Sequence, residues 1–141
     1  MSKIFLCASM NFYRELVSIE EKLTQKGHNV GIPVSAQTMK TKNDFEVSHF
    51  KGVFSDEQRA GYIRQNFEEI INSDAILVIN NEKNGVPGYI GANVLMEIAF
   101  AFFYHKKIFV WNPILDNAPY LEELRIFAVQ VINQDLSQIH V

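Results

Sequence analysis

A single carboxylate near the start of an apolar helix is the side chain of this sequence best suited to chemistry. Residues 91–101 read GANVLMEIAFA and follow a β-branched apolar run at residues 75–80 and a glycine-rich loop. We expect this helix to begin near Asn93, which places Glu97 in its first turn, where free N–H groups and the helix macrodipole favour the ionised form. An ionised carboxylate in a crevice is a usable nucleophile. The alternative is a glutamate that only completes the N-terminus of the helix.

Polar residues follow three predicted strands at one edge of the expected sheet. Ligands of an open parallel sheet bind beyond the carboxyl ends of its strands, and here these ends lead into residues 9–11, 80–93 and 112–113. We expect these segments to share one crevice, with these candidate substrate-binding residues: Ser9, Asn11, Asn80, Gly88, Tyr89, Gly91 and Asn93. Asp74 instead precedes its strand, roughly 20 Å from that edge at about 3.3 Å per residue, so we interpret it as structural.

Other kinds of site find little support in the sequence. Gly85, Gly88 and Gly91 do not follow the dinucleotide-binding pattern G-x-G-x-x-G. The histidines are isolated from one another and from paired carboxylates, so we predict no metal site. Cys7 lies in an apolar strand without an identifiable base, and the sequence contains no G-x-S-x-G motif, so a serine or cysteine hydrolase is not favoured. We expect no cofactor.

Strands and helices alternate along the chain. Apolar periodicity predicts helices between five strands, at residues 3–8, 29–34, 75–80, 107–111 and 129–132. One helix opens with Ser55 and Gln58 in capping-box register. This order predicts one α/β domain over residues 1–141, a doubly wound parallel sheet of about five strands with a flavodoxin-like order and helices on both faces. Residues 35–54 form an unusually long connection, which predicts a lid, a binding loop or a disordered segment.

The composition favours small-molecule chemistry. The 141 residues are 48% hydrophobic and fit one domain. The chain has 13 basic and 16 acidic residues, and neither sign forms a run, so we predict no nucleic-acid partner. The longest apolar run, residues 98–104, is far shorter than the ~20 residues that span a bilayer, and the N-terminus has no long apolar leader segment. We therefore expect no membrane association and a cytoplasmic location.

The helix after Gly91 is apolar on more than one face. Its core stripe is predicted at Leu95, Ile98 and Phe102. Further aromatic residues stand partly off this stripe, at Phe100, Phe103 and Tyr104. A second apolar face favours burial against another subunit, so the sequence predicts a homodimer or a higher homo-oligomer.

Three segments resemble the nucleoside 2-deoxyribosyltransferase superfamily, which includes the deoxynucleoside 5′-monophosphate N-glycosidases. They are FLCAS at residues 5–9, SDAILV at residues 73–78 and EIAFA at residues 97–101, and GYIGAN at residues 88–93 is similar to an uncharacterised Y-I-G-x-N branch. The resemblance implies that Glu97 is the nucleophile and that Ser9 helps to bind a 5′-phosphate. Three positions depart from the family pattern: Phe5 replaces a tyrosine, Gly91 a serine or aspartate, and Asn66 a catalytic aspartate.

The asparagine at position 66 leaves more than one function open, because an amide cannot exchange a proton near neutral pH. The first prediction is cleavage or transfer of the N-glycosidic bond of a nucleoside or nucleoside 5′-monophosphate, with Glu97 and Asn66 as the candidate catalytic residues. The second is a nucleotide-binding or sensing protein with weak or lost catalysis. The third, a cytokinin-activating type of phosphoribohydrolase, fits less well, because its motif P-G-G-x-G-T-x-x-E is shorter than the stretch from Pro87 to Glu97.

Overall fold

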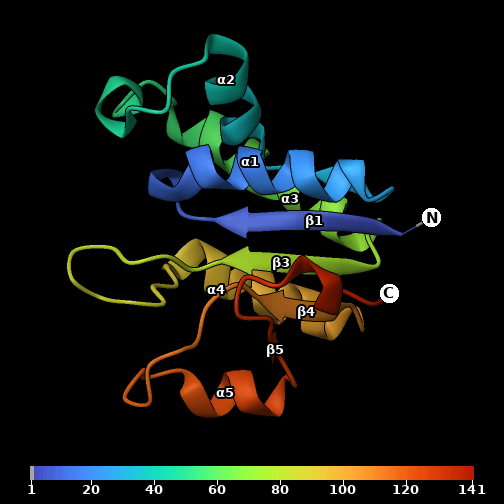
Figure 1. Cartoon of the computed structure of the whole chain (residues 1–141). Coiled ribbons are helices and arrows are strands. Elements are labelled where there is room, and N and C mark those ends of the chain that lie inside the picture. Colours follow the sequence, from blue (N-terminus) through green and yellow to red (C-terminus); the bar gives the residue numbers. More distant parts are fainter. Residues whose placement is uncertain (1) are drawn as a thin grey trace.

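A computed structural model describes residues 2–141, which form a five-stranded, fully parallel sheet (Figure 1). The strands are β1 (Lys3–Ala8), β2 (Asn29–Gly31), β3 (Ala75–Ile79), β4 (Lys107–Val110) and β5 (Gln130–Val131). They lie in the order β2-β1-β3-β4-β5, with each neighbouring pair parallel. The predicted flavodoxin-like α/β fold is confirmed. The second strand ends earlier than predicted, at Gly31 rather than at residue 34.

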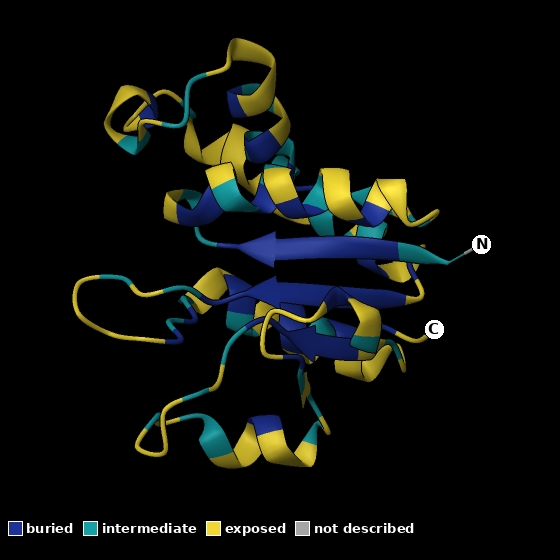
Figure 2. Cartoon of the chain, in the orientation of Figure 1, coloured by how far each residue is buried: buried dark blue, intermediate teal, exposed yellow. Residues whose placement is uncertain are grey.

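Helices cover both faces of this sheet (Figure 1). They are α1 (Tyr13–Gln25), α2 (Val34–Lys42), α3 (Asp56–Ile71), α4 (Ala92–Phe103) and α5 (Leu121–Ile126), with 3-10 turns η1 (Met10–Phe12), η2 (Val47–Phe50) and η3 (Leu136–Gln138). Ile4 and Leu6 of β1 face a core with α1 and α2, whereas Phe5 and Cys7 face a core with α3, α4 and α5. Both faces of β1 are therefore buried, as Figure 2 shows, which explains its uninterrupted apolar sequence.

The connection at residues 35–54 contains most of α2 and all of η2, which argues against the disordered segment among the three predicted alternatives. The helix is hard to recognise because only Ala36 and Met39 are buried, so its apolar stripe is short. It ends at Lys42, and the next residue, Asn43, has a φ of 50°, the left-handed conformation that commonly follows a helix. By contrast, the predicted capping box of Ser55 and Gln58 is present at the start of α3.

The start and the core face of α4 differ from the prediction. The helix begins at Ala92 after the N-cap Gly91, so Glu97 lies in the second turn rather than the first. Its buried stripe consists of Val94, Glu97, Ile98 and Ala101. Phe102, predicted as core, is 42% exposed, because it lies outside the face that Val94, Ile98 and Ala101 turn toward the core. Within residues 2–141, no helix has both the length and the apolar character to cross a membrane.

Candidate functional site

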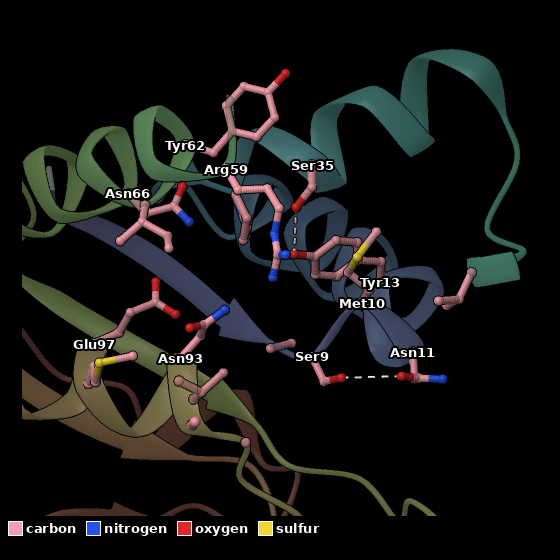
Figure 3. Close-up of a pocket in the computed structure, with 18 of the residues that line it drawn as sticks. Ser9, Met10, Asn11, Tyr13, Ser35, Arg59, Tyr62, Asn66, Asn93 and Glu97 are labelled. Atoms are coloured by element: carbon pink, nitrogen blue, oxygen red, sulfur yellow. Dashed lines mark hydrogen bonds between the residues drawn. The ribbon is translucent and has the colours of Figure 1, made fainter. Parts of the chain in front are cut away.

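A cavity of about 420 Å³ lies beyond the carboxyl end of β1, where the sequence predicts a crevice (Figure 3). It is enclosed by residues that follow β1, by the starts of α1 and α2, by one face of α3 and by the first two turns of α4. Val47 and Phe54, from the segment between α2 and α3, also line it. The cavity therefore joins parts of the chain that lie far apart in sequence.

Glu97 lies in this cavity and is only 7% exposed. Its Oε2 atom is buried and has no hydrogen-bond partner among residues 2–141. Burial raises the pKa of Glu97 to about 8, because a desolvated carboxylate loses the hydration that stabilises its charge. The expectation that this side chain is ionised at rest is therefore wrong: it lies too far from the helix N-terminus to benefit from the dipole, and burial dominates.

Two amides lie beside this carboxyl group. Asn66 of α3 faces Glu97 across the cavity, and Asn93 lies one turn before it on α4 (Figure 3). Ser9 and Asn11 line the other end of the cavity, where the Ser9 hydroxyl donates to Asn11 Oδ1 at 3.3 Å. Gly91 also lines the cavity, at the N-cap of α4. The fold thus brings most of the candidate residues predicted from the sequence into one space.

Asn80, Gly88 and Tyr89 are not among the residues that line the cavity, so their predicted direct contact with substrate is not supported by the geometry. Asn80 is fully buried, and its amide donates to the Asn112 carbonyl and accepts from the Asn112 N–H, each at 2.8 Å. The side chain of Asn80 therefore joins the ends of β3 and β4. Gly88 packs against the Pro113 carbonyl, and the Tyr89 ring packs against Gly91.

Several cavity residues were not predicted. Arg59 and Tyr62 lie on the same face of α3 as Asn66, at spacings of seven and four residues that could have identified them. Tyr13 is buried, its hydroxyl lies 2.8 Å from Ser35 Oγ, and burial raises the pKa of Tyr13. No comparable signal existed for Lys83, because its position depends on how a loop folds.

Three of the described residues that line the cavity are of the acidic or basic types: Arg59, Lys83 and Glu97. They determine the charge of the cavity. Glu97 is mostly protonated at pH 7 because its pKa is about 8. The Arg59 side chain is 63% exposed, and the carboxylate of Asp56 lies 3.9 Å from it. Asp56 is itself fully exposed to water, so it neutralises little of the charge of Arg59. The cavity is therefore cationic at neutral pH and suits an anionic ligand.

The chain is thus an α/β protein with a five-stranded parallel sheet, and its cavity beyond β1 contains a buried glutamate of α4. Among solved structures, a 2-deoxyribosyltransferase from the psychrotolerant bacterium Bacillus psychrosaccharolyticus is 19% identical, with a TM-score of 0.60 over 85% of this chain and 79% of its own. The CMP N-glycosidase of Clostridium botulinum is 17% identical, with a TM-score of 0.52 over 92% and 87%. The resemblance is thus confirmed for the fold.

No family model and no curated protein sequence matches this chain. At these levels of identity, the structural likeness establishes the arrangement of strands and helices, and function must be argued from the site itself.

Proposed function

We propose that this protein binds a nucleoside or nucleoside 5′-monophosphate in the cavity and cleaves or transfers its N-glycosidic bond. The observation that carries the proposal is Glu97, an almost completely buried carboxyl group with a free oxygen inside a ligand-sized cavity. A glutamate isolated in this way has no structural partner to explain its burial. The shared fold supports the reaction class, since the two similar structures are a 2-deoxyribosyltransferase and a CMP N-glycosidase.

In the proposed mechanism, the ionised Glu97 attacks the anomeric carbon through an oxocarbenium-like transition state. The bond between that carbon and the base nitrogen breaks, and its electron pair leaves with the base. Water then hydrolyses the glycosyl ester, or a second base displaces Glu97, which gives hydrolysis or transfer. Burial makes ionisation of Glu97 costly, but the positive charge that develops on the sugar stabilises the carboxylate in the transition state.

Asn66 favours a second candidate function, a nucleotide-binding or sensing protein. Its amide can hydrogen-bond a sugar or base but cannot protonate the departing base. In the enzyme, the base must then take its proton from water or from another group. Detection of released base separates the two functions, because a sensor would bind the same ligands without releasing base.

The charge of the cavity favours a phosphorylated ligand. Arg59 and Lys83 come from separate segments, and Ser9 adds a hydroxyl to the lining. A phosphate provides three acceptor oxygens, and hydrogen bonds from cations to phosphate are roughly twice as strong as neutral ones. We therefore assign the 5′-monophosphate of a nucleoside, rather than the free nucleoside, as the better ligand.

Arg59→Met provides the test of this assignment. A panel of nucleosides and nucleoside 5′-monophosphates, including cytidine and CMP, is assayed for binding by calorimetry and for released base by chromatography. We expect Arg59→Met to lower the affinity for the monophosphates by about 10-fold or more and the affinity for the nucleosides only slightly, because only the charge-assisted contact with phosphate is lost. Arg64→Met is the matched control, since Arg64 lies on α3 but does not line the cavity. Equal weakening of both ligand types would refute the assignment.

We also propose that the protein assembles as a homodimer or a higher homo-oligomer. Phe103 of α4 is 72% exposed, and Phe102 and Tyr104 beside it are also exposed. This aromatic face continues through Phe100, which stacks on Phe67 of α3 with ring centroids 4.4 Å apart. Exposed aromatic groups of this kind commonly mark an interface between protein chains.

Phe103→Asp is expected to dissociate this assembly, because a carboxylate would have to be buried in an apolar contact. Light scattering at micromolar concentration measures the mass of both proteins. A monomeric wild-type protein would exclude the oligomer, and an unchanged mass for the variant would exclude this face as the interface.

A further inference from the structure

A chain of polar side chains behind the cavity has no part in the reaction proposed above. Its final acceptor is Glu15 of α1, a half-buried carboxylate that does not line the cavity. Glu15 Oε1 accepts a hydrogen bond from Trp111 Nε1 at 3.0 Å, and Glu15 Oε2 accepts one from Asn81 Nδ2. Each oxygen of the carboxylate is therefore paired with one buried or half-buried donor, from the segments that follow β4 and β3.

The hydrogen bonds from Gln134 to Glu15 all run toward the carboxylate. Gln134 Nε2 donates to Asn112 Oδ1 at 2.9 Å. Asn112 Nδ2 donates to Asn81 Oδ1 at 3.1 Å and to the Asn80 carbonyl at 3.2 Å. Asn81 in turn donates to Glu15. Asn112 and Asn81 each accept with the amide oxygen and donate with the NH₂ group, so the series must end on an acceptor. The Glu15 carboxylate provides one oxygen for Asn81 and the other for Trp111.

Asn81 is also the base of the loop that carries Lys83 to the cavity. The Asn81 carbonyl accepts from the Tyr89 N–H at 3.0 Å, which closes the loop. Lys83 and Val86 exchange backbone hydrogen bonds of 3.0 and 2.9 Å at its tip. The Lys83 ammonium lies 4.9 Å from the centroid of the Tyr89 ring. The loop is therefore an internally bonded unit, and the side chain of Asn81 ties its base to α1 through Glu15.

We propose that Glu15 is a positioning residue that holds the loop of residues 81–90, and with it Lys83, at the cavity. Its effect on ligand binding rests on the proposed function, because Lys83 is assigned there to the phosphate. The hydrogen-bond direction makes the proposal specific: position 15 requires two acceptor oxygens, and an amide of the same size supplies one. Its NH₂ group would face the other donor.

Glu15→Gln tests this requirement with almost no change in volume. Turning the Asn81 amide around does not relieve the mismatch, because its NH₂ would then face the NH₂ of Asn112. Asn81→Asp in the same protein should relieve it, since a carboxylate at position 81 accepts both from the new amide and from Asn112. Glu21→Gln is the matched control, an exposed glutamate of α1 outside the chain of hydrogen bonds.

Hydrogen exchange of the ligand-free proteins measures the hold on the loop. We expect Glu15→Gln to accelerate exchange in residues 82–90 by about tenfold, since one of the two donors that face position 15 loses its acceptor. Exchange in β1 and β3 should stay as in the wild type, and the double variant should restore slow exchange in the loop. Unchanged loop exchange in Glu15→Gln, or a double variant that is no slower than the single one, would overturn the proposal.

Calorimetry with CMP and cytidine measures the effect on the cavity. We expect Glu15→Gln to lower the affinity for CMP by about fivefold or more and the affinity for cytidine by less than about twofold, because the lost contact is with the phosphate. In a Lys83→Met protein, the same substitution should change neither affinity further. Equal weakening of both ligands would indicate a general loss of structure and overturn the proposal. If neither ligand binds the wild type, the proposed function fails, and the exchange experiment still decides whether Glu15 holds the loop.

Discussion

Glu97→Gln is expected to abolish the release of base and, at neutral pH, to stabilise the protein. Glutamine keeps the size of the side chain but lacks the negative charge that captures the sugar cation, so turnover should fall by at least about a thousandfold. Binding of CMP should largely survive, because Arg59 and Lys83 are unchanged. Chromatography of the released base and calorimetry on the same samples separate these two effects. Retained turnover would reject the catalytic role.

The gain in stability follows from the sign of the pKa change. Burial raises the pKa of Glu97 from 4.5 to about 8, so between these values the folded protein holds a proton that the unfolded chain has released. The free energy of unfolding of the wild type therefore falls as pH rises through this window. Glutamine does not titrate, so the variant should be more stable by roughly 3 kcal/mol at pH 7 and by almost nothing at pH 4. Urea denaturation at both pH values measures the difference.

The same pKa predicts the pH dependence of turnover. If the carboxylate of the free protein attacks the sugar, kcat/KM should rise tenfold per pH unit below the pKa of Glu97 and level off above about pH 8. If Glu97 only completed the N-terminus of a helix, its replacement by glutamine would instead lower the free energy of unfolding by about 0.3–1 kcal/mol at neutral pH. A less stable Glu97→Gln protein would therefore contradict the assignment of a buried, protonated acid.

The fold could be predicted because both faces of the sheet are covered, so that strands such as β1 and β3 are apolar throughout and contrast with the periodic helices between them. Helix α2 could not, since two buried side chains make too weak a pattern. Within the site, Glu97 was predicted from the order of strand, loop and helix, and Asn66 from the family resemblance. The charge state of Glu97 was not, because it depends on packing around the side chain rather than on its position along the helix.

Asn80 and Arg59 show the same limit within the site. Asn80 ends a predicted strand and Arg59 lies within a predicted helix, but sequence spacing does not tell which polar side chain is bonded inside the protein and which faces the cavity. Asn80 satisfies its amide on Asn112 across the sheet, a contact between residues 32 apart. Arg59 instead lines the cavity through a helical face that was recognisable only once Asn66 was taken as its reference point.

Gly88→Ala is expected to cause the largest loss of stability of any single methyl group added to the loop between β3 and α4. Gly88 has a φ of +64°, and a Cβ atom there would lie 2.4 Å from the Pro113 carbonyl oxygen. That oxygen belongs to the backbone and cannot rotate away, so the loop must separate from the segment after β4. Left-handed strain and overpacking together predict a loss of roughly 2–4 kcal/mol.

Gly85→Ala distinguishes the steric clash from the backbone strain. Gly85 has a similar φ of +76°, but no atom lies within 4 Å of the position of an added Cβ. This control should lose only about 1–2 kcal/mol, the cost of left-handed backbone alone. Urea denaturation of both variants measures the difference, which isolates the contact between Gly88 and Pro113. Equal losses would mean that this contact does not hold the loop. A larger loss at Gly88, with weaker CMP binding, would show that the same contact keeps Lys83 at the cavity.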